Sequence, residues 1–171
     1  MSTACRKICL AIALLLIFGC SQTRNIISDS YRAADVLLDR APDEVTKETP
    51  FLVTSFVNIN DLEESTTLGR LLSEQIASKI AQKGYRVKEI KLSDGSLFVI
   101  KGSGEFVLSR RLENIRSSFS SNYVIVGTYS VGYESVYVSS RIVRIEDSVI
   151  VSSYDFKIRG DDDLWALIKN Q

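Results

Sequence analysis

The chain has 171 residues, with 21 Lys and Arg against 21 Asp and Glu, no histidine and three cysteines. This balanced charge argues against nucleic-acid binding, which needs a clustered basic face. The lack of histidine removes the commonest general base and the commonest neutral metal ligand, and so argues against most hydrolases and metalloenzymes.

The N-terminal segment has the pattern of a secretory signal. Arg6 and Lys7 precede an apolar run, residues 8–18, that carries no charge. A run of about eleven residues is too short for a membrane-spanning helix, which needs roughly twenty. A positive region, a short apolar core and the small residue Gly19 are typical of a cleaved signal peptide over residues 1–19.

Cys20 directly follows Gly19 and indicates a particular kind of signal peptide. Residues 17–20, "IFGC", resemble a bacterial lipobox, in which the cysteine thiol receives a diacylglycerol and becomes the new N-terminus. Cys5 and Cys9 have no apolar segment in front of them. We therefore expect signal cleavage between Gly19 and Cys20 and attachment to membrane lipid through acylated Cys20. A plain signal peptide and an uncleaved anchor with an incidental cysteine are the alternatives.

The mature chain must hold together by packing. Removing 19 of the 171 residues leaves 152, a suitable size for one domain, and leaves no cysteine other than Cys20. No disulfide or zinc–thiolate site is then available. Loss of Arg6 and Lys7 gives 19 basic against 21 acidic residues. Acyl chains would therefore hold the protein at a lipid surface, and more than one chain is needed for stable anchoring.

The first predicted element is a helix close to the anchor. Residues 25–41, "NIISDSYRAADVLLDRA", repeat apolar side chains at helical spacing: Ile27, Tyr31, Ala34 and Leu38. This pattern predicts an amphipathic helix that ends before Pro42. An acylated tether, residues 20–24, would precede a single domain, residues 25–171. Four residues span at most ~14 Å, so we expect the domain to lie close to the bilayer.

A strand–helix–strand unit comes next. Residues 51–59, "FLVTSFVNI", predict a mostly buried strand. A loop with capping residues follows, and Gly84 ends a helix whose apolar residues recur at helical spacing: Leu68, Leu71, Leu72, Ile76 and Ile80. Ser73 falls off this stripe. Residues 85–92, "YRVKEIKL", predict a second strand, so the unit is a right-handed crossover between parallel strands.

The second half of the chain is predicted to contain mostly strands joined by short turns. Residues 97–106 predict a short strand or a hairpin with a Gly-Ser-Gly turn, and residues 108–119 predict a second amphipathic helix. Three β-rich runs with short turns between them then predict an antiparallel meander: 122–132, 135–145 and 148–158. A short helix with three aspartates at its start closes the chain.

These elements together predict one domain of the α/β (α+β) class. We expect a mixed sheet of about five strands, with the crossover on one side, the C-terminal antiparallel meander on the other and helices packed on the sheet. The sequence shows no internal repeat, no low-complexity segment and no second domain.

Few residues indicate a site. The adjacent aspartates 161–163 could hold a hard cation, but without a ligand-bearing loop they are typical of a solvated helix start. Arg110 and Arg111 could contact an anionic partner, or could belong to another solvated helix start. Tyr133, in a predicted turn, is the best candidate for an exposed partner contact. We therefore expect no enzyme activity, catalytic residue, cofactor, metal site or small-molecule substrate.

Three stretches carry a family resemblance: "LVTSFVNINDLEESTTLGRLLSEQIASKIAQKGYRVKEIKL", "SGEFVLSRRLENI" and "NYVIVGTYSVG…SVYVSSRIVRIEDSVIVSSYDF". Their most specific parts are Leu68-Gly69-Arg70 and Leu108-Ser109-Arg110, which open the two helices, and Gly127-Thr128-Tyr129 in the central strand. In this order and spacing the chain resembles the FlgO family of flagellar outer-membrane lipoproteins, from about Ile26 to Ile158.

The resemblance implies a fold and a role. The fold would be akin to the periplasmic domains of the curli secretion lipoprotein and of lipoproteins that activate cell-wall synthases. The role would be non-catalytic, helping to build or stabilise the flagellar structure at the outer membrane and so supporting motility. The family supplies no catalytic residue, and only its acylated cysteine is carried over, to Cys20. Flagellar basal-body or outer-membrane proteins are the expected partners, and self-association in a ring is an option.

The residue after the cysteine indicates the membrane to which the protein is anchored. Ser21 differs from the Asp common in lipoproteins kept at the inner membrane, so we expect an outer-membrane anchor with the domain facing the periplasm.

The alternative functions each need a feature that the sequence lacks. A lipoprotein activator of a cell-wall synthase would need a longer linker to reach through the cell-wall layer. A component of a curli-type secretion apparatus would need extra strands of about ten alternating residues for a barrel. A lipid-anchored hydrolase would lack both histidine and a second thiol.

Overall fold

The computed structural model describes residues 25–62, 66–89 and 121–169. Within these ranges it has three helices and one mixed sheet of six strands, which confirms the predicted fold class. In chain order the elements are α2 (Ile26–Asp39), β1 (Pro50–Val53), β2 (Val57–Asn58), α3 (Thr67–Gln82), β3 (Arg86–Glu89), β4 (Tyr123–Val131), β5 (Ser135–Arg144), β6 (Ile150–Arg159) and α5 (Asp162–Lys169). The predicted hairpin at 97–106 and helix at 108–119 lie outside the described residues.

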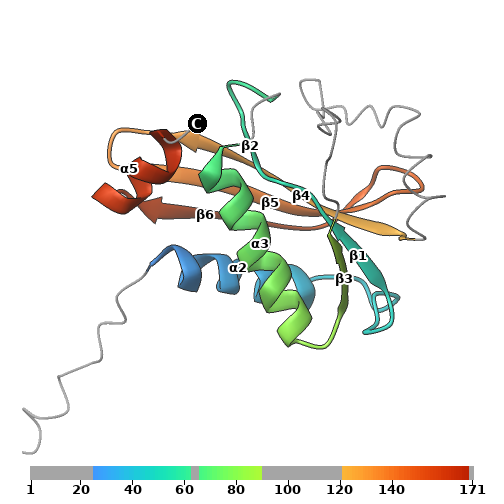
Figure 1. Cartoon of the computed structure of the whole chain (residues 1–171). Coiled ribbons are helices and arrows are strands. Elements are labelled where there is room, and N and C mark those ends of the chain that lie inside the picture. The colour runs from blue at the N-terminus through green and yellow to red at the C-terminus, as the bar shows by residue number, and fades with distance from the viewer. Residues whose placement is uncertain (1–24, 63–65, 90–120, 170–171) are drawn as a thin grey trace, which may run out of the picture.

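The sheet combines a parallel and an antiparallel half. Its order is β3-β1-β4-β5-β6, with β2 as a short extra partner of β4 (Figure 1). Strand β1 is parallel to both β3 and β4, as the predicted crossover requires. Strands β4, β5 and β6 form the predicted antiparallel meander.

The predicted single strand at 51–59 is wrong, because the chain makes two short strands there. Between β1 and β2 the Phe56 N–H donates to the carbonyl of Gly69, at the start of α3, at 3.1 Å. The Phe56 ring lies against Gly127 of β4, where a Cβ would overlap it, and a Cβ on Gly69 would overlap the Phe56 carbonyl. Two glycines therefore make room for a fully buried phenylalanine that interrupts the strand.

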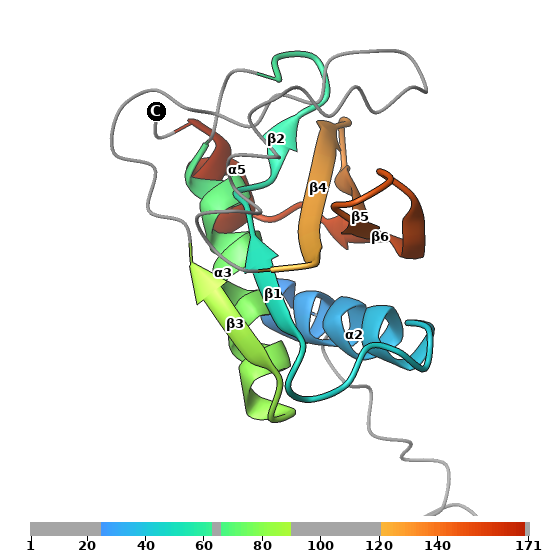
Figure 2. The ribbon, with the colours of Figure 1, turned by 90° about the vertical axis from the view of Figure 1, so that its right-hand side faces the viewer.

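Helices α2 and α3 cover one face of the sheet (Figures 1 and 2). Their apolar stripes, with Leu164 of α5, pack on the sheet residues of one parity in a single core: Phe51, Val53, Tyr123, Ile125, Tyr129, Val136, Val138, Ile142 and Ile158. Asp35 of α2 pairs with Lys83 at the end of α3 at 2.9 Å. The apolar faces of the helices and of the sheet thus share this core, as the amphipathic patterns predict.

The helix ends follow from local chemistry. Asn25 and Ser28 form a reciprocal capping box at the start of α2. Gly84 follows the end of α3 with φ +87°, a left-handed conformation that glycine adopts without strain. Ser73 of α3 corrects the sequence interpretation, because it is buried and its Oγ donates to the Arg70 carbonyl at 2.7 Å.

The opposite face of the sheet carries a second, smaller apolar cluster. Leu52, Val124, Val143 and Ile145 are all buried there, and they alternate with the residues that face the helices. Both faces of the β1–β4–β5 region are therefore apolar, which explains the nearly continuous hydrophobic run of β4.

Candidate functional site

The structure describes one of the partner-contact residues expected from the sequence. Tyr133 lies in the turn between β4 and β5, and its side chain is fully exposed, at 104%. Gly19, Cys20, Arg110 and Arg111 lie outside the described residues, so the cleavage, lipidation and basic-contact assignments stay predictions.

The turn that carries Tyr133 is held in place from both sides. The Gly132 N–H donates to the Ser135 carbonyl at 2.9 Å, and the Gly160 N–H donates to the Glu134 carbonyl at 2.8 Å. The Trp165 ring of α5 lies against Gly160, where a Cβ would overlap it. A fixed backbone with an exposed phenol ring offers a partner contact area at a low cost in conformational entropy.

A polar cavity of about 510 Å³ lies at the other end of the β4–β5 hairpin. It is open to solvent where the loop before β1 meets the start of β4 and the end of β5. Its lining includes the carboxylates of Glu44, Glu48 and Glu146 together with Tyr123 and Arg144. No local sequence pattern marks this cavity, because its lining comes from three segments that are far apart in the chain.

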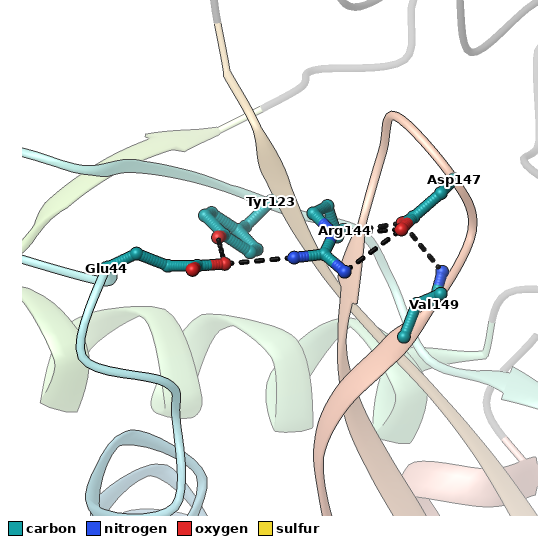
Figure 3. A network of polar contacts seen from close by, with 5 residues as sticks. All are labelled: Glu44, Tyr123, Arg144, Asp147 and Val149. Carbon is teal, nitrogen blue, oxygen red and sulfur yellow. Dashed lines mark hydrogen bonds and ion pairs between the residues drawn. The ribbon is translucent and has the colours of Figure 1, made fainter.

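Arg144 is the centre of the polar network beside the cavity (Figure 3). Its Nε donates to both carboxylate oxygens of Asp147, at 3.0 and 3.1 Å, and its Nη1 donates to Glu44 Oε1 at 3.0 Å. The same Glu44 oxygen accepts the Tyr123 hydroxyl at 2.8 Å. The Val149 N–H donates to Asp147 Oδ1 at 3.2 Å. The loop before β1, the start of β4 and the end of β5 thereby meet at one carboxylate oxygen, Glu44 Oε1.

The network shifts the pKa of three of its members. Burial raises the pKa of the Tyr123 phenol, and the hydrogen bond to Glu44 raises it further. The hydrogen bond from Arg144 holds the pKa of Asp147 below its ordinary value, and the same bond raises the pKa of Arg144. Near neutral pH Tyr123 is therefore a neutral donor, Asp147 an anion and Arg144 a cation.

Such groups are suited to holding the chain together and to contacting charged partners. A general acid or base works best when its pKa lies near the working pH, and all three shifts move away from neutrality. The network joins the loop before β1 to the end of β5 and to the β5–β6 turn. Only the Arg144–Asp147 pair, three residues apart, could be expected from the sequence. Glu44 lies 100 residues away from Arg144, so no local pattern predicts their contact.

The described residues contain no group of three or more His, Cys, Asp or Glu side chains placed to hold a metal ion. Of the aspartates 161–163, Asp161 accepts the Leu164 N–H at 2.8 Å and so caps α5. No helix within the described ranges combines the length and the apolar character needed to cross a membrane.

Comparison with known proteins gives one family and one fold. The sequence model of the FlgO protein family matches residues 31–163. No curated protein sequence matches the chain. Among solved structures, the LpoB C-terminal domain from Escherichia coli is similar with a TM-score of 0.55 and 13% identity, over 79% of this chain and 98% of that one. The LpoB C-terminal domain from Salmonella enterica gives a TM-score of 0.51 at 14% identity, over 77% and 96% of the two chains.

Proposed function

The chain belongs to the FlgO protein family, and from this premise we propose that it is a non-catalytic outer-membrane lipoprotein that supports motility. It would help to assemble or stabilise the flagellar structure where that structure passes the outer membrane. Its partners would be flagellar basal-body or outer-membrane proteins, with self-association in a ring as one arrangement. The supporting observation is the family match over residues 31–163, which extends from α2 to the start of α5.

The anchor in this proposal is the acylated Cys20, with the domain facing the periplasm. Helix α2 starts at Ile26 and is capped by Asn25, so the folded domain begins a few residues after the lipid. A domain held this close to the bilayer suits a component of a layer beneath the outer membrane.

The anchor can be tested with one substitution and two matched controls. Cys20→Ala should abolish fatty-acid labelling and leave an unprocessed precursor, because only this thiol follows the apolar run. Cys5→Ser and Cys9→Ser should change neither labelling nor processing. Labelling that persists in the Cys20→Ala protein would contradict the proposal.

The flagellar role can be tested by deleting the gene and restoring it in wild-type and Cys20→Ala form. We expect the deletion strain to swim poorly, the wild-type gene to restore swimming, and the unanchored protein to restore it poorly. Electron micrographs should show fewer or damaged flagella in the two defective strains. Normal swimming and normal flagella in the deletion strain would refute the role.

A lipoprotein activator of a cell-wall synthase is the second candidate function. It is favoured by one observation, the likeness of the fold to the LpoB C-terminal domain over 98% of the Escherichia coli domain. The likeness at 13% identity extends to the fold alone. A deletion strain with impaired cell-wall synthesis and intact swimming would favour this second function over the first.

A further inference from the structure

Among the described strands, β6 forms one edge of the sheet. It is ten residues long, Ile150–Arg159, contains no proline, and within the described residues pairs with β5 alone. The backbone N–H and C=O groups on the outer side of an edge strand are available to another strand.

The hydrogen-bond pattern between β5 and β6 determines which residues of β6 have outward backbone groups. The Gly160 N–H donates to the Glu134 carbonyl, and in an antiparallel pair bonded and non-bonded residues alternate. Ile158, Phe156 and Tyr154 therefore bond to β5, and the odd-numbered residues between them point outward. The Arg40 guanidinium confirms this pattern, because it donates to the Ser153 carbonyl from outside the strand at 3.3 Å.

Of the described elements, helix α2 covers one end of this edge, and none of them covers the other. Arg40, the C-cap residue of α2, donates a hydrogen bond to the Ser153 carbonyl. Beyond it, Asp155, Lys157 and Arg159 are exposed and have outward backbone groups. On the helical side of the same stretch the half-buried rings of Tyr154 and Phe156 stack with centroids 5.9 Å apart.

We propose that the open half of β6 pairs with the same edge of a second copy, antiparallel and centred on Phe156. Asp155 of each copy then lies directly opposite Lys157 of the other, which gives two attractive charge pairs. The two Phe156 rings meet on the helical side and cover each other. The contact is isologous, so it closes as a twofold dimer and does not propagate into a fibre.

Charge complementarity selects this register. Centring the twofold on Asp155 or on Lys157 would place two like charges directly opposite each other. Centring it on Ile158 would place Lys157 opposite Arg159. Like charges directly across a strand pair are destabilising, and opposite charges are stabilising. The register centred on Phe156 satisfies every outward group at Asp155 and Lys157 without a like-charge pair.

The pairing goes beyond the proposed flagellar role, because it names a surface of this chain and needs no other protein. It can be measured with the full-length acylated protein in detergent micelles, by sedimentation over a concentration series. Wild-type protein should be a dimer. Asp155→Lys and Lys157→Asp should each weaken dimerisation on the order of tenfold or more, because each turns two attractive pairs into two repulsive ones.

The decisive sample is a mixture of these two variants. Paired in the proposed register, an Asp155→Lys chain and a Lys157→Asp chain again have opposite charges at both positions. The mixture should therefore form a heterodimer about as tight as the wild type, at protein concentrations where each variant alone is mostly monomeric. Glu74→Lys, an exposed charge reversal on α3, should leave the dimer unchanged.

A backbone variant tests the strand pairing itself. Lys157→Pro removes an outward N–H that β5 does not use, and edge strands tolerate proline at such positions. It should abolish the dimer while circular dichroism and the melting temperature stay near those of the wild type. Should it unfold the protein, the charge mixture still decides the question.

Three outcomes would overturn the pairing: a monomeric wild type, single variants that dimerise as the wild type does, or a mixture without heterodimer. The proposed function fails separately. A monomeric protein in a strain whose swimming depends on it would refute the pairing alone, and a dimer in a strain that swims normally without the gene would refute the flagellar role alone.

Discussion

Protonation of Asp147 should make the stability of the fold depend on pH. It accepts two hydrogen bonds from Arg144 and one from the Val149 N–H, and its pKa is held below the ordinary value. A lowered carboxyl pKa stabilises the folded state above the pKa of the unfolded chain, about 4. The stabilisation is lost as the pH falls through the folded-state pKa.

We therefore expect Asp147→Asn to lower the melting temperature at pH 7 and to have a shrinking effect as the pH falls below about 4. The effect should be modest, because the side chain is 42% exposed and exposed ion pairs are screened by solvent. Thermal melts across this pH range, with the exposed Asp43→Asn as control, provide the measurement. A difference that stays constant down to pH 2 would show that the charge of Asp147 does not stabilise the fold.

Leu72 of α3 is fully buried in the main core. Leu72→Ala should lower the free energy of unfolding by ~2–5 kcal/mol, through lost transfer energy and the cavity left behind. The matched control is Ser78→Ala on the exposed side of α3. Ser73, which the spacing places off the apolar stripe, is unsuitable because it is buried and hydrogen-bonded. Equal losses for Ser78 and Leu72 in chemical denaturation would contradict this packing.

The start of α3 depends on Thr66. Its hydroxyl accepts the Gly69 N–H at 3.2 Å and shares a buried hydrogen bond with the Tyr129 hydroxyl at 2.6 Å. Thr66→Ala removes the helix cap and a partner of a buried phenol, so we expect a loss of about 1–3 kcal/mol in the free energy of unfolding. Thr66→Ser keeps the oxygen and should lose much less. Equal losses in urea denaturation would show that the Thr66 methyl group, not its hydroxyl, is what matters.

At the scale of elements, sequence patterns predict those helices and strands that depend on residues close together in the chain. The helices over 26–39 and 67–82, the three antiparallel strands and the crossover all follow from periodicity, caps and turn residues. The break at Phe56 does not, because it depends on Gly69 and Gly127, which lie 13 and 71 positions later in the chain. The same limit applies to the site. Tyr133 follows from its turn, whereas the Glu44–Arg144 contact depends on the whole fold.

For the whole molecule, the height above the bilayer is the property that the proposed function depends on. Inserting about thirty Gly/Ser residues after Thr23 would raise the root-mean-square reach of the tether to ~30 Å. The insertion precedes α2 and touches no described element, so folding should be preserved. Swimming should nevertheless be impaired, because neighbouring domains would lose their common height and their effective concentration would fall.

Swimming assays, electron micrographs and fatty-acid labelling of the insertion strain provide the measurement. A matched insertion of two residues at the same point should have little effect. Wild-type swimming with the long tether would count against a layered assembly and would favour an activator that must reach toward the cell wall.

The position of α2 determines how a β6-linked pair would sit on a membrane. The helix packs on one face of the sheet (Figure 2), and the twofold axis of an antiparallel strand pair runs perpendicular to the sheet. Both copies would then carry their helices, and the lipids just ahead of them, on the same side. One bilayer could receive both anchors only if it lies parallel to the sheet, beneath the helices. Tyr137 and the charges of β6, which alternate with the core-facing residues, would be turned toward the periplasm.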